Sequence, residues 1–310
     1  MLLSVQTEGL ISQFGVREGY KMIADAGFQA VDWNIDHAWN NRGVLERKNG
    51  KVVRCIFDQP MEEIFDFYRE ELDAMKENGL VIGQAHAPFP AYKTDDPDWF
   101  EYAIHIYKKC IEFCEKVGCP HLVIHGISRR KAEPQLTPAL IDELNDRLYE
   151  SLLEVLKGKK IVVCMENLFS GRSPDRRVAG HCADATEAAA YIDKMNEKAG
   201  RKAFALCLDT GHLFLLHKDF RDYTRKLGER IAILHVHDNS AQADDHIAPY
   251  AGALPWAEFC EGLHNAGYRG NMNFETFNAY DTGKVPRELV PEFLRHIAVI
   301  GNYFIKQIEG

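Results

Sequence analysis

Short apolar runs alternate along the chain with longer segments whose apolar residues recur at helical spacing. Continuous apolar runs of this length are typical of parallel strands that are covered on both faces. The segment that opens at Pro60 shows the helical pattern, because its apolar residues from Met61 to Met75 follow every three or four positions. Glycines such as Gly27 and Gly118 stand where predicted helices would end.

The pattern predicts eight strands, each followed by a helix. The strands are expected at 2–7, 30–35, 81–85, 121–126, 160–167, 204–209, 231–236 and 271–275, and the helices at 16–26, 60–75, 98–117, 138–156, 184–198, 220–227, 255–266 and 286–308. Alternating units of this kind predict an α/β fold with a parallel sheet, and eight of them close into a (β/α)8 TIM barrel whose site lies at the carboxyl ends of the strands. A doubly wound open sheet is the alternative. It is disfavoured because polar residues end at least six strands, whereas an open sheet gathers its site at one switch point.

The length of 310 residues agrees with a single barrel domain, 1–310, that carries an insertion at about 37–58 after the second strand. Asn49-Gly50 stands between two strand-like runs in this insertion, which is a β-hairpin signal. A hairpin at the carboxyl end of a strand is expected to act as a lid or a subunit contact. Trp33, His37 and Trp39 would then form an aromatic wall for a ring-shaped substrate.

Composition and charge restrict the classes of binding partner that the protein is expected to have. A net charge of −9 and a pI near 5.8 give no basic surface for nucleic acid or an anionic membrane. The eight cysteines form no CxxC pair, and Cys110 and Cys114 stand one helical turn apart as packing residues. No leader pattern and no apolar run of roughly 18 residues is present. We therefore expect a cytoplasmic protein, without membrane or nucleic-acid partners, that forms a homo-oligomer or part of a complex.

Four apolar runs end in side chains that bind divalent cations. These side chains are Glu166, Asp209, His235 and Glu275. Either glutamate alone could instead bond backbone N–H groups or an arginine, but no Lys or Arg stands beside either in sequence. Three carboxylates and an imidazole suit Mn²⁺ best, with Mg²⁺, Co²⁺ or Zn²⁺ as alternatives. The sequence thus predicts one metal site at this end of the sheet.

Further residues are candidates for contact with the substrate. They are His86, His125, His212, His237, Trp33 and Arg172, with His246 and Asp244 as weaker candidates. His86 and His125 end strands and could also hold a second metal or be core histidines. His237 follows His235 by two positions, so both point to the same side of a strand. The loop 170–182, with Arg172, Arg176 and Arg177, is expected over the barrel mouth, where an arginine favours a phosphate or carboxylate group on the substrate.

Seven short motifs, taken in order, carry a family resemblance. They are His-Ala-Pro at 86–88, Ile-His-Gly at 124–126, Met-Glu-Asn at 165–167, Leu-Asp-Thr-Gly-His at 208–212, His-Val-His-Asp at 235–238, Gly-Ala-Leu-Pro-Trp at 252–256 and Phe-Glu-Thr-Phe at 274–277. In this order the chain resembles the xylose-isomerase-like, or endonuclease-IV-like, TIM barrels. These include sugar isomerases, ketose 3-epimerases, inosose dehydratase and abasic-site endonucleases.

The resemblance implies roles for particular residues. The metal quartet of the epimerases falls on Glu166, Asp209, His235 and Glu275, with His212 on the substrate side. The additional ligands of the multi-metal endonucleases fall near His86, His125, His212, Asp244 and His246. Two positions depart from the ketose 3-epimerase pattern, since Arg172 and Ala241 replace a glutamate and an arginine.

The sequence leaves three classes of function open. The first is a metal-dependent isomerase or epimerase of sugars or keto sugars, in which Glu166 and Glu275 move protons next to a carbonyl through a metal-stabilised enediolate. A lyase or dehydratase could use the same residues, as in inosose dehydration or β-elimination from a 3-keto glycoside. An abasic-site hydrolase is the second class, and it lacks the expected basic groove. A catalytically silent barrel is the third.

Overall fold

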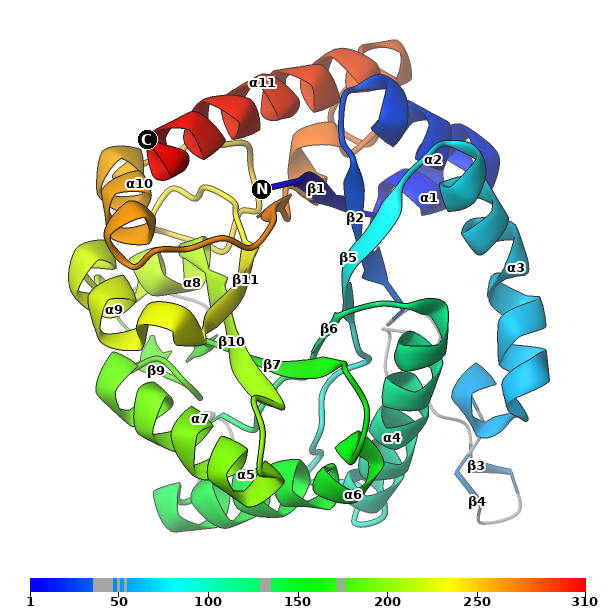
Figure 1. Ribbon diagram of the computed structural model, residues 1–310, viewed down its shortest axis with the longest axis vertical. Helices are drawn as coiled ribbons and strands as arrows, with labels where there is room; N and C mark the ends of the chain where they lie inside the picture. The colour runs from blue at the N-terminus through cyan, green and yellow to red at the C-terminus, as the bar shows by residue number, and fades with distance from the viewer. Residues whose placement is uncertain (36–46, 49–50, 53–54, 129–134, 172–174, 176) are drawn as a thin grey trace.

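The computed structural model describes residues 1–35, 47–48, 51–52, 55–128, 135–171, 175 and 177–310. Its centre is a ring of strands enclosed by helices, as Figure 1 shows in a view along the barrel. The eight strands of the ring are β1 (Leu3–Gln6), β2 (Ala30–Asn34), β5 (Val81–His86), β6 (His121–Val123), β7 (Val162–Glu166), β10 (Phe204–Asp209), β11 (Ile231–His235) and β12 (Met272–Phe274). The predicted strands are therefore all present.

The strands are parallel and close into a barrel. Their order is β11-β10-β7-β6-β5-β2-β1-β12, with parallel pairing throughout. The two end strands meet through a parallel bridge between Val236 and Phe274, where Val236 N–H donates to the Asn273 carbonyl at 2.9 Å. This closure confirms the (β/α)8 TIM barrel and excludes the open doubly wound sheet.

The helices form the outer layer. They are α1 (Leu10–Phe14), α2 (Val16–Asp25), α3 (Met61–Glu77), α4 (Trp99–Val117), α5 (Pro138–Ser151), α6 (Leu153–Leu156), α7 (Ala185–Ala199), α8 (Thr210–Leu215), α9 (Phe220–Leu227), α10 (Trp256–Asn265) and α11 (Val290–Glu309). Short 3₁₀ turns lie at Ile56–Asp58, Gly228–Arg230, Phe277–Tyr280 and Arg287–Leu289. α1 and α8 were not expected, and the helix predicted at 138–156 is divided into α5 and α6.

Two small hairpins lie outside the ring. β3 (Arg47–Lys48) and β4 (Lys51–Val52) are antiparallel, with Lys48 opposite Lys51, which confirms the hairpin predicted in the insertion. A second hairpin, β8 (Phe169–Ser170) with β9 (Val178–Ala179), occupies the loop expected to be irregular. The proposed role of the first hairpin as a lid or subunit contact stays a prediction.

Alternation along the strands separates two cores. Every second residue points outward into a large apolar layer between strands and helices, and Trp33, Tyr68 and Phe113 pack there with ring centroids 5.0 to 5.5 Å apart. The other residues point into the barrel, where a small apolar layer is formed by Val123, Cys164, Ala205, Cys207 and Ile233. The polar residues two positions further along these strands form the next layer inside the barrel.

The eight cysteines are all buried and free, and Cys110 and Cys114 pack on α4 as predicted. Among the described residues, no helix has the length and apolar character needed to cross a membrane. The expected cytoplasmic location and the homo-oligomeric assembly stay predictions.

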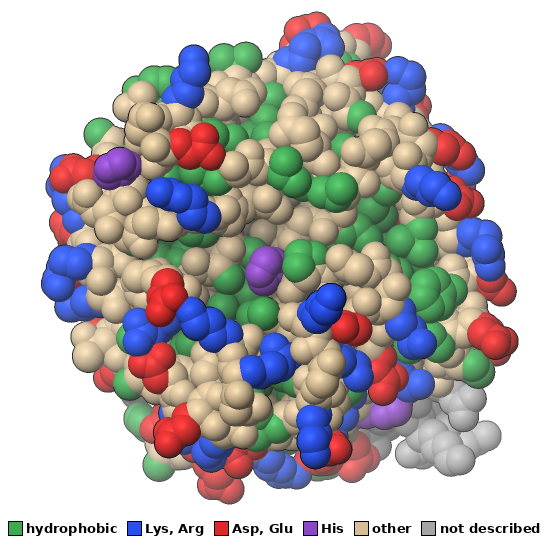
Figure 2. All heavy atoms as spheres, in the orientation of Figure 1, with side chains coloured by type: hydrophobic (Ala, Val, Ile, Leu, Met, Phe, Trp, Pro, Cys, Tyr) green, Lys and Arg blue, Asp and Glu red, His purple; other side chains and the backbone are tan. Residues whose placement is uncertain are grey.

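Charged side chains of both signs are interspersed over the face of the molecule in Figure 2, without a wide area of one sign.

Candidate functional site

A cavity of ≈ 270 Å³ opens at the carboxyl ends of the strands, where polar side chains replace the apolar ones. We call it the barrel cavity. Among the described residues, it is lined by Gln6, Glu8, Asn34, His86, Phe89, His125, Glu166, His212, Asp244, His246, Glu275 and Phe277. Five of the predicted metal or substrate residues therefore reach it from β5, β7, α8 and two loops, in addition to His246 and Asp244.

Glu166 lies at the centre of the site. Its Oε2 is 3.0 Å from His125 Nε2 and 3.1 Å from His235 Nδ1, and its Oε1 is 3.0 Å from His212 Nδ1. His86 Nε2 approaches both His125 Nε2, at 3.0 Å, and Glu166 Oε2, at 3.9 Å. Because Glu166 ends β7, it joins histidines that come from four different parts of the chain.

His235 connects Glu166 to the second glutamate. Its Nδ1 lies 3.5 Å from Glu275 Oε2, and its Nε2 lies 3.1 Å from Asp32 Oδ2 on β2. Asp32 is fully buried and also accepts hydrogen bonds from Gln84 and Asn273 at 3.0 and 2.9 Å. Asp32 thus orients the His235 ring, in the way that outer carboxylates commonly orient ligating histidines.

Asp209 ends β10, as predicted, whereas His212 lies in the first turn of α8 and not in a loop. The Asp209 side chain caps this helix by accepting a hydrogen bond from the His212 backbone N–H at 2.6 Å. The His212 ring then lies with Nδ1 3.6 Å from Asp209 Oδ1. A capped helix start places the carboxylate and the imidazole side by side at the inner face of the barrel.

His237, Asp244 and His246 form a neighbouring group. His237 Nε2 is 3.1 Å from both oxygens of Asp209, and its ring stacks on His246 with centroids 4.0 Å apart. Asp244 Oδ2 lies 3.3 Å from His212 Nε2 and 3.2 Å from His246 Nε2. Both His235 and His237 therefore point inward, as their spacing predicts, but they contact different carboxylates.

The loop that carries Asp244 and His246 is held by Asp238. Its Oδ1 accepts hydrogen bonds from Asn239 N and Leu254 N at 2.8 and 3.1 Å. Its Oδ2 accepts from Tyr250 N and Trp256 Nε1 at 2.9 and 3.0 Å. This fully buried carboxylate therefore fixes both ends of the segment between β11 and α10.

The carboxylates of the site are balanced by histidines. Burial alone would raise the pKa of Glu166, but the His125 and His235 charges outweigh it and hold the pKa well below its ordinary value. Burial lowers the pKa of His212, yet Asp209 and Asp244 raise it well above its ordinary value. Burial and the His125 charge lower the pKa of His86 to about 3. Within the described chain, no Lys or Arg pairs with Glu166, Asp209, Asp244 or Glu275.

This arrangement fits a divalent cation. Ligand atoms of Asp209, His235 and Glu275 lie within 4.8 Å of one another, and so do those of Glu166, Asp209 and His212. Both ring nitrogens of His235 are buried and, among the described residues, lack a hydrogen bond of acceptable geometry. A ligand bond at Nδ1 would satisfy one of them. A cation would also supply the positive charge that protonated histidines otherwise provide.

Two further groups of possible metal ligands lie close to this one. Atoms of His86, His125 and Glu166 lie within 4.8 Å of one another, as do those of His237, Asp244 and His246. A role for these residues as additional metal ligands stays a prediction.

The structure corrects the expectation for Trp33. Its side chain is fully buried on the outside of β2, where Nε1 donates to Glu71 Oε2 at 2.8 Å. Its neighbours Asp32 and Asn34 point inward instead, so Trp33 cannot form part of a wall around a ligand. His37, Trp39, Arg172 and Arg176 lie outside the described residues.

Phe169 and the described part of the loop 170–182 contact two other parts of the site. The Phe169 ring contacts the His212 ring with centroids 5.0 Å apart. Arg177 Nη1 donates to the carbonyl of Ala241, in the loop after β11, at 2.8 Å. The loop is therefore joined to the segment that carries Asp244.

Several residues of the site were missed from the sequence. They are Gln6, Glu8, Asp32, Asn34, Gln84, Phe89, Asn273 and Phe277. Gln6, for example, donates to Glu275 Oε1 at 2.7 Å. The available signal was a polar residue at every second position near the end of a strand, as in Asp32 and Asn34.

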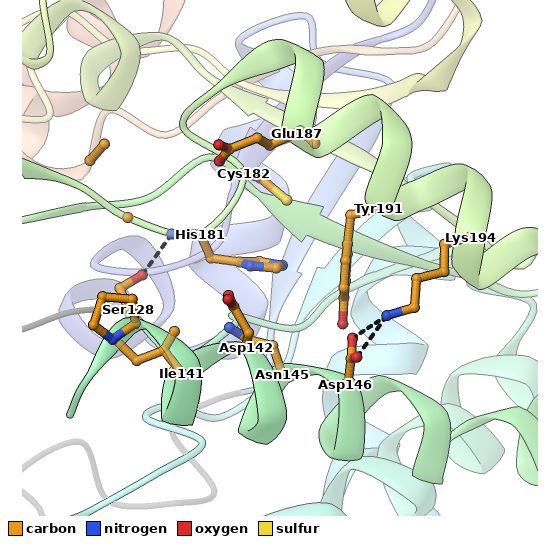
Figure 3. Close-up of a pocket in the computed structure, with 14 residues that line it drawn as sticks. Ser128, Ile141, Asp142, Asn145, Asp146, His181, Cys182, Glu187, Tyr191 and Lys194 are labelled. Atoms are coloured by element: carbon orange, nitrogen blue, oxygen red, sulfur yellow. Dashed lines mark hydrogen bonds and ion pairs between the residues drawn. The ribbon is translucent and has the colours of Figure 1, made fainter.

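A larger cavity, ≈ 520 Å³, lies elsewhere, between α5 and α7. Figure 3 shows Asp142 and Asp146 reaching it from α5 and Glu187, Tyr191 and Lys194 from α7. Lys194 closes part of it through an ion pair with Asp146 at 2.6 Å. None of the candidate metal or substrate residues in the described chain lines this cavity.

The chain is similar to several known proteins. D-psicose 3-epimerase from Enterocloster bolteae is 27% identical over 229 residues, which cover 70% of each chain. A probable endonuclease 4 from Mycoplasmopsis synoviae is 24% identical over 60% of this chain and 61% of its own. The structure of 3-keto-D-glucoside 4-epimerase, YcjR, from E. coli shares the fold, with a TM-score of 0.67, 15% identity and coverage of 96% and 99%. A family model described as xylose isomerase-like TIM barrel matches residues 20–297. The chain therefore belongs to the family of xylose isomerase-like TIM barrels.

Proposed function

We propose that the protein is a divalent-metal-dependent isomerase or epimerase of sugars or keto sugars. The observation that carries this proposal is the position of Glu166 and Glu275, whose Oε2 atoms lie 3.1 and 3.5 Å from His235 Nδ1 beside a cavity of ≈ 270 Å³. Glu166, Asp209, His235 and Glu275 would hold the cation. When bound, a divalent cation polarises a carbonyl group and offsets the negative charge of an enediolate.

The side chains themselves move the proton. One glutamate takes a proton from the carbon next to the carbonyl, and the other returns a proton to the adjacent position or to the opposite face. Gln6 holds Glu275 Oε1, which leaves Oε2 for this role. His86, His125, His212 and His246 line the same space and can bind hydroxyl groups of the substrate, whereas His237 lies behind them against Asp209. Epimerase activity in two related proteins, by their names, supports the proposal.

A lyase or dehydratase remains the alternative outcome of the same proton abstraction. A second candidate is an endonuclease-like phosphodiester hydrolase, because the groups at His86, His125 and Glu166 and at His237, Asp244 and His246 could hold further ions. The net charge of −9 opposes it, since duplex DNA favours a basic surface. Three zinc ions per chain together with cleavage of abasic DNA would favour this candidate.

The test is solvent exchange in D₂O. The Mn²⁺-loaded protein is incubated with keto sugars, sugar phosphates and 3-keto glycosides, and NMR detects deuterium on the carbon next to the carbonyl. Glu275→Gln should slow incorporation by about 100-fold or more, the scale of general acid and base catalysis. Glu187→Gln, in the cavity between α5 and α7, is the matched control and should keep the wild-type rate. Absence of exchange with every compound would reject the proposed function.

A further inference from the structure

A second space adjoins the barrel cavity and remains without a role in the proposed chemistry. This side compartment has a volume of ≈ 230 Å³. Among the described residues, it is lined by Phe89, Pro90, Ala91, Tyr92, His125, Gly126, Ile127, Ser128, Leu136, Leu168, Phe169 and Ser170. Phe89 and His125 line both spaces, so a ligand in one lies directly next to the other.

The two spaces differ in the side chains that line them. The barrel cavity carries carboxylates, histidines and amides, which suit the hydroxyl and carbonyl groups of a sugar. In the described part of the side compartment, by contrast, apart from His125 the polar side chains are the hydroxyl groups of Tyr92, Ser128 and Ser170. The Ser128 hydroxyl already accepts a hydrogen bond from His181 N–H at 2.9 Å. The side chains of the compartment therefore offer few hydrogen-bonding groups to a second polyhydroxylated ring, which makes binding of such a ring unfavourable.

Aromatic rings mark the boundary between the spaces. The Phe89 ring lies 4.9 Å from the His125 ring and 5.4 Å from the His86 ring, measured between centroids. The Phe169 ring lies 5.0 Å from the His212 ring in the same way. Phe89 is nevertheless 40% exposed, so a ligand beside it would cover apolar surface that water now contacts. Flat rings on this boundary favour a planar apolar group.

We propose that the side compartment binds the planar, apolar aglycone of a sugar glycoside whose sugar ring occupies the barrel cavity. This inference rests on the proposed function and narrows its substrate to keto glycosides. The aglycone would contact Phe89 and Phe169, while the glutamates act on the sugar.

Binding is tested first, without turnover. The probe is 4-nitrophenyl β-D-glucoside, which lacks the ketone, and saturation-transfer NMR reports which of its protons contact the protein. Strong transfer to the aryl protons in the wild type and its loss in Phe89→Ala are expected. Phe67→Ala removes another exposed phenylalanine, on α3, and should behave as the wild type. Absence of aryl transfer in the wild type, or equal transfer in Phe89→Ala, would overturn the inference.

Turnover then separates the two proposals. Deuterium exchange is compared for 4-nitrophenyl and methyl 3-keto-β-D-glucosides, which share the sugar and differ in the aglycone. We expect the wild-type kcat/KM to be about tenfold higher for the aryl compound, and Phe89→Ala to remove most of that advantage. Equal values for both compounds in the wild type would overturn the side-compartment inference and leave the proposed function standing. Aryl binding without exchange of either compound would reject the proposed function instead.

Discussion

Gly211→Ala is the substitution whose effect follows most directly from the packing of the site. Gly211 lies in the first turn of α8, and a Cβ atom there would stand 2.0 Å from His237 Cε1 and 2.6 Å from its Nε2. His237 is fully buried, so its ring has no solvent into which it can move. The displacement would break the contacts of 3.1 Å between His237 Nε2 and the Asp209 carboxylate.

The size of the effect is the sum of three contributions. Alanine in a helix is up to about 1 kcal/mol more favourable than glycine. Overpacking costs about 1 to 3 kcal/mol, and loss of a hydrogen bond to a charged group costs about 1.5 to 3 kcal/mol. Gly211→Ala should therefore lower the free energy of unfolding by about 1.5 to 5 kcal/mol. The metal content should fall as well, because Asp209 is one of the proposed ligands.

Urea unfolding followed by circular dichroism measures the stability, and mass spectrometry of the purified protein measures the metal. Gly19→Ala on α2 is the control, because the nearest atom to its added Cβ is Ile11 Cδ1, at 2.7 Å, the end of a flexible side chain. Its free energy of unfolding should stay within about 1 kcal/mol of the wild type. A Gly211→Ala protein as stable as the wild type, with native metal content, would refute the packing argument.

Three other substitutions test the surroundings of the site. Asp238→Asn should lower the free energy of unfolding by about 3 kcal/mol, since an amide N–H₂ would face the donors that now bind Oδ2, including Trp256 Nε1; an unchanged urea midpoint would contradict this. Asp32→Asn should weaken Mn²⁺ binding about 10- to 100-fold in calorimetry, because His235 Nε2 loses the charged carboxylate beside it. An unaltered Mn²⁺ affinity would show that Asp32 does not orient His235. Trp33→Phe should reduce stability and leave KM for any sugar substrate unchanged, whereas a raised KM with native stability would restore Trp33 to the site.

Much of the fold could be predicted from the sequence because each strand of the barrel is a continuous apolar run. The run from Ala205 to Leu208 is buried, and Asp209, the residue that follows it at the end of β10, reaches the polar layer. The same local pattern identified Glu166, His235 and Glu275 as residues at the ends of strands. Their convergence followed from the barrel, in which all carboxyl ends meet on one face.

What the sequence did not reveal depends on long-range packing. Trp33 was predicted to bind a ligand because it is aromatic. In the register of β2, however, its side chain points out of the barrel, and those of Asp32 and Asn34 point into it. The helix at Thr210–Leu215 begins without a break after β10, so no loop separates it from the strand, and Gly211 in its first turn does not favour a helix. The sequence showed Asp238 only as the last residue of the His-Val-His-Asp motif. Its role in holding the loop was not visible, because its hydrogen-bond partners lie up to 18 residues away in the chain.

The central claim is that side chains from four strands hold one divalent cation between the two glutamates. Anomalous diffraction from crystals grown with Mn²⁺ would locate the ion directly. We expect a peak bound by Glu166, Asp209, His235 and Glu275 that disappears in Glu275→Gln crystals. A peak that instead joins His86 to His125, or His237 to His246, with nothing between the glutamates would contradict it.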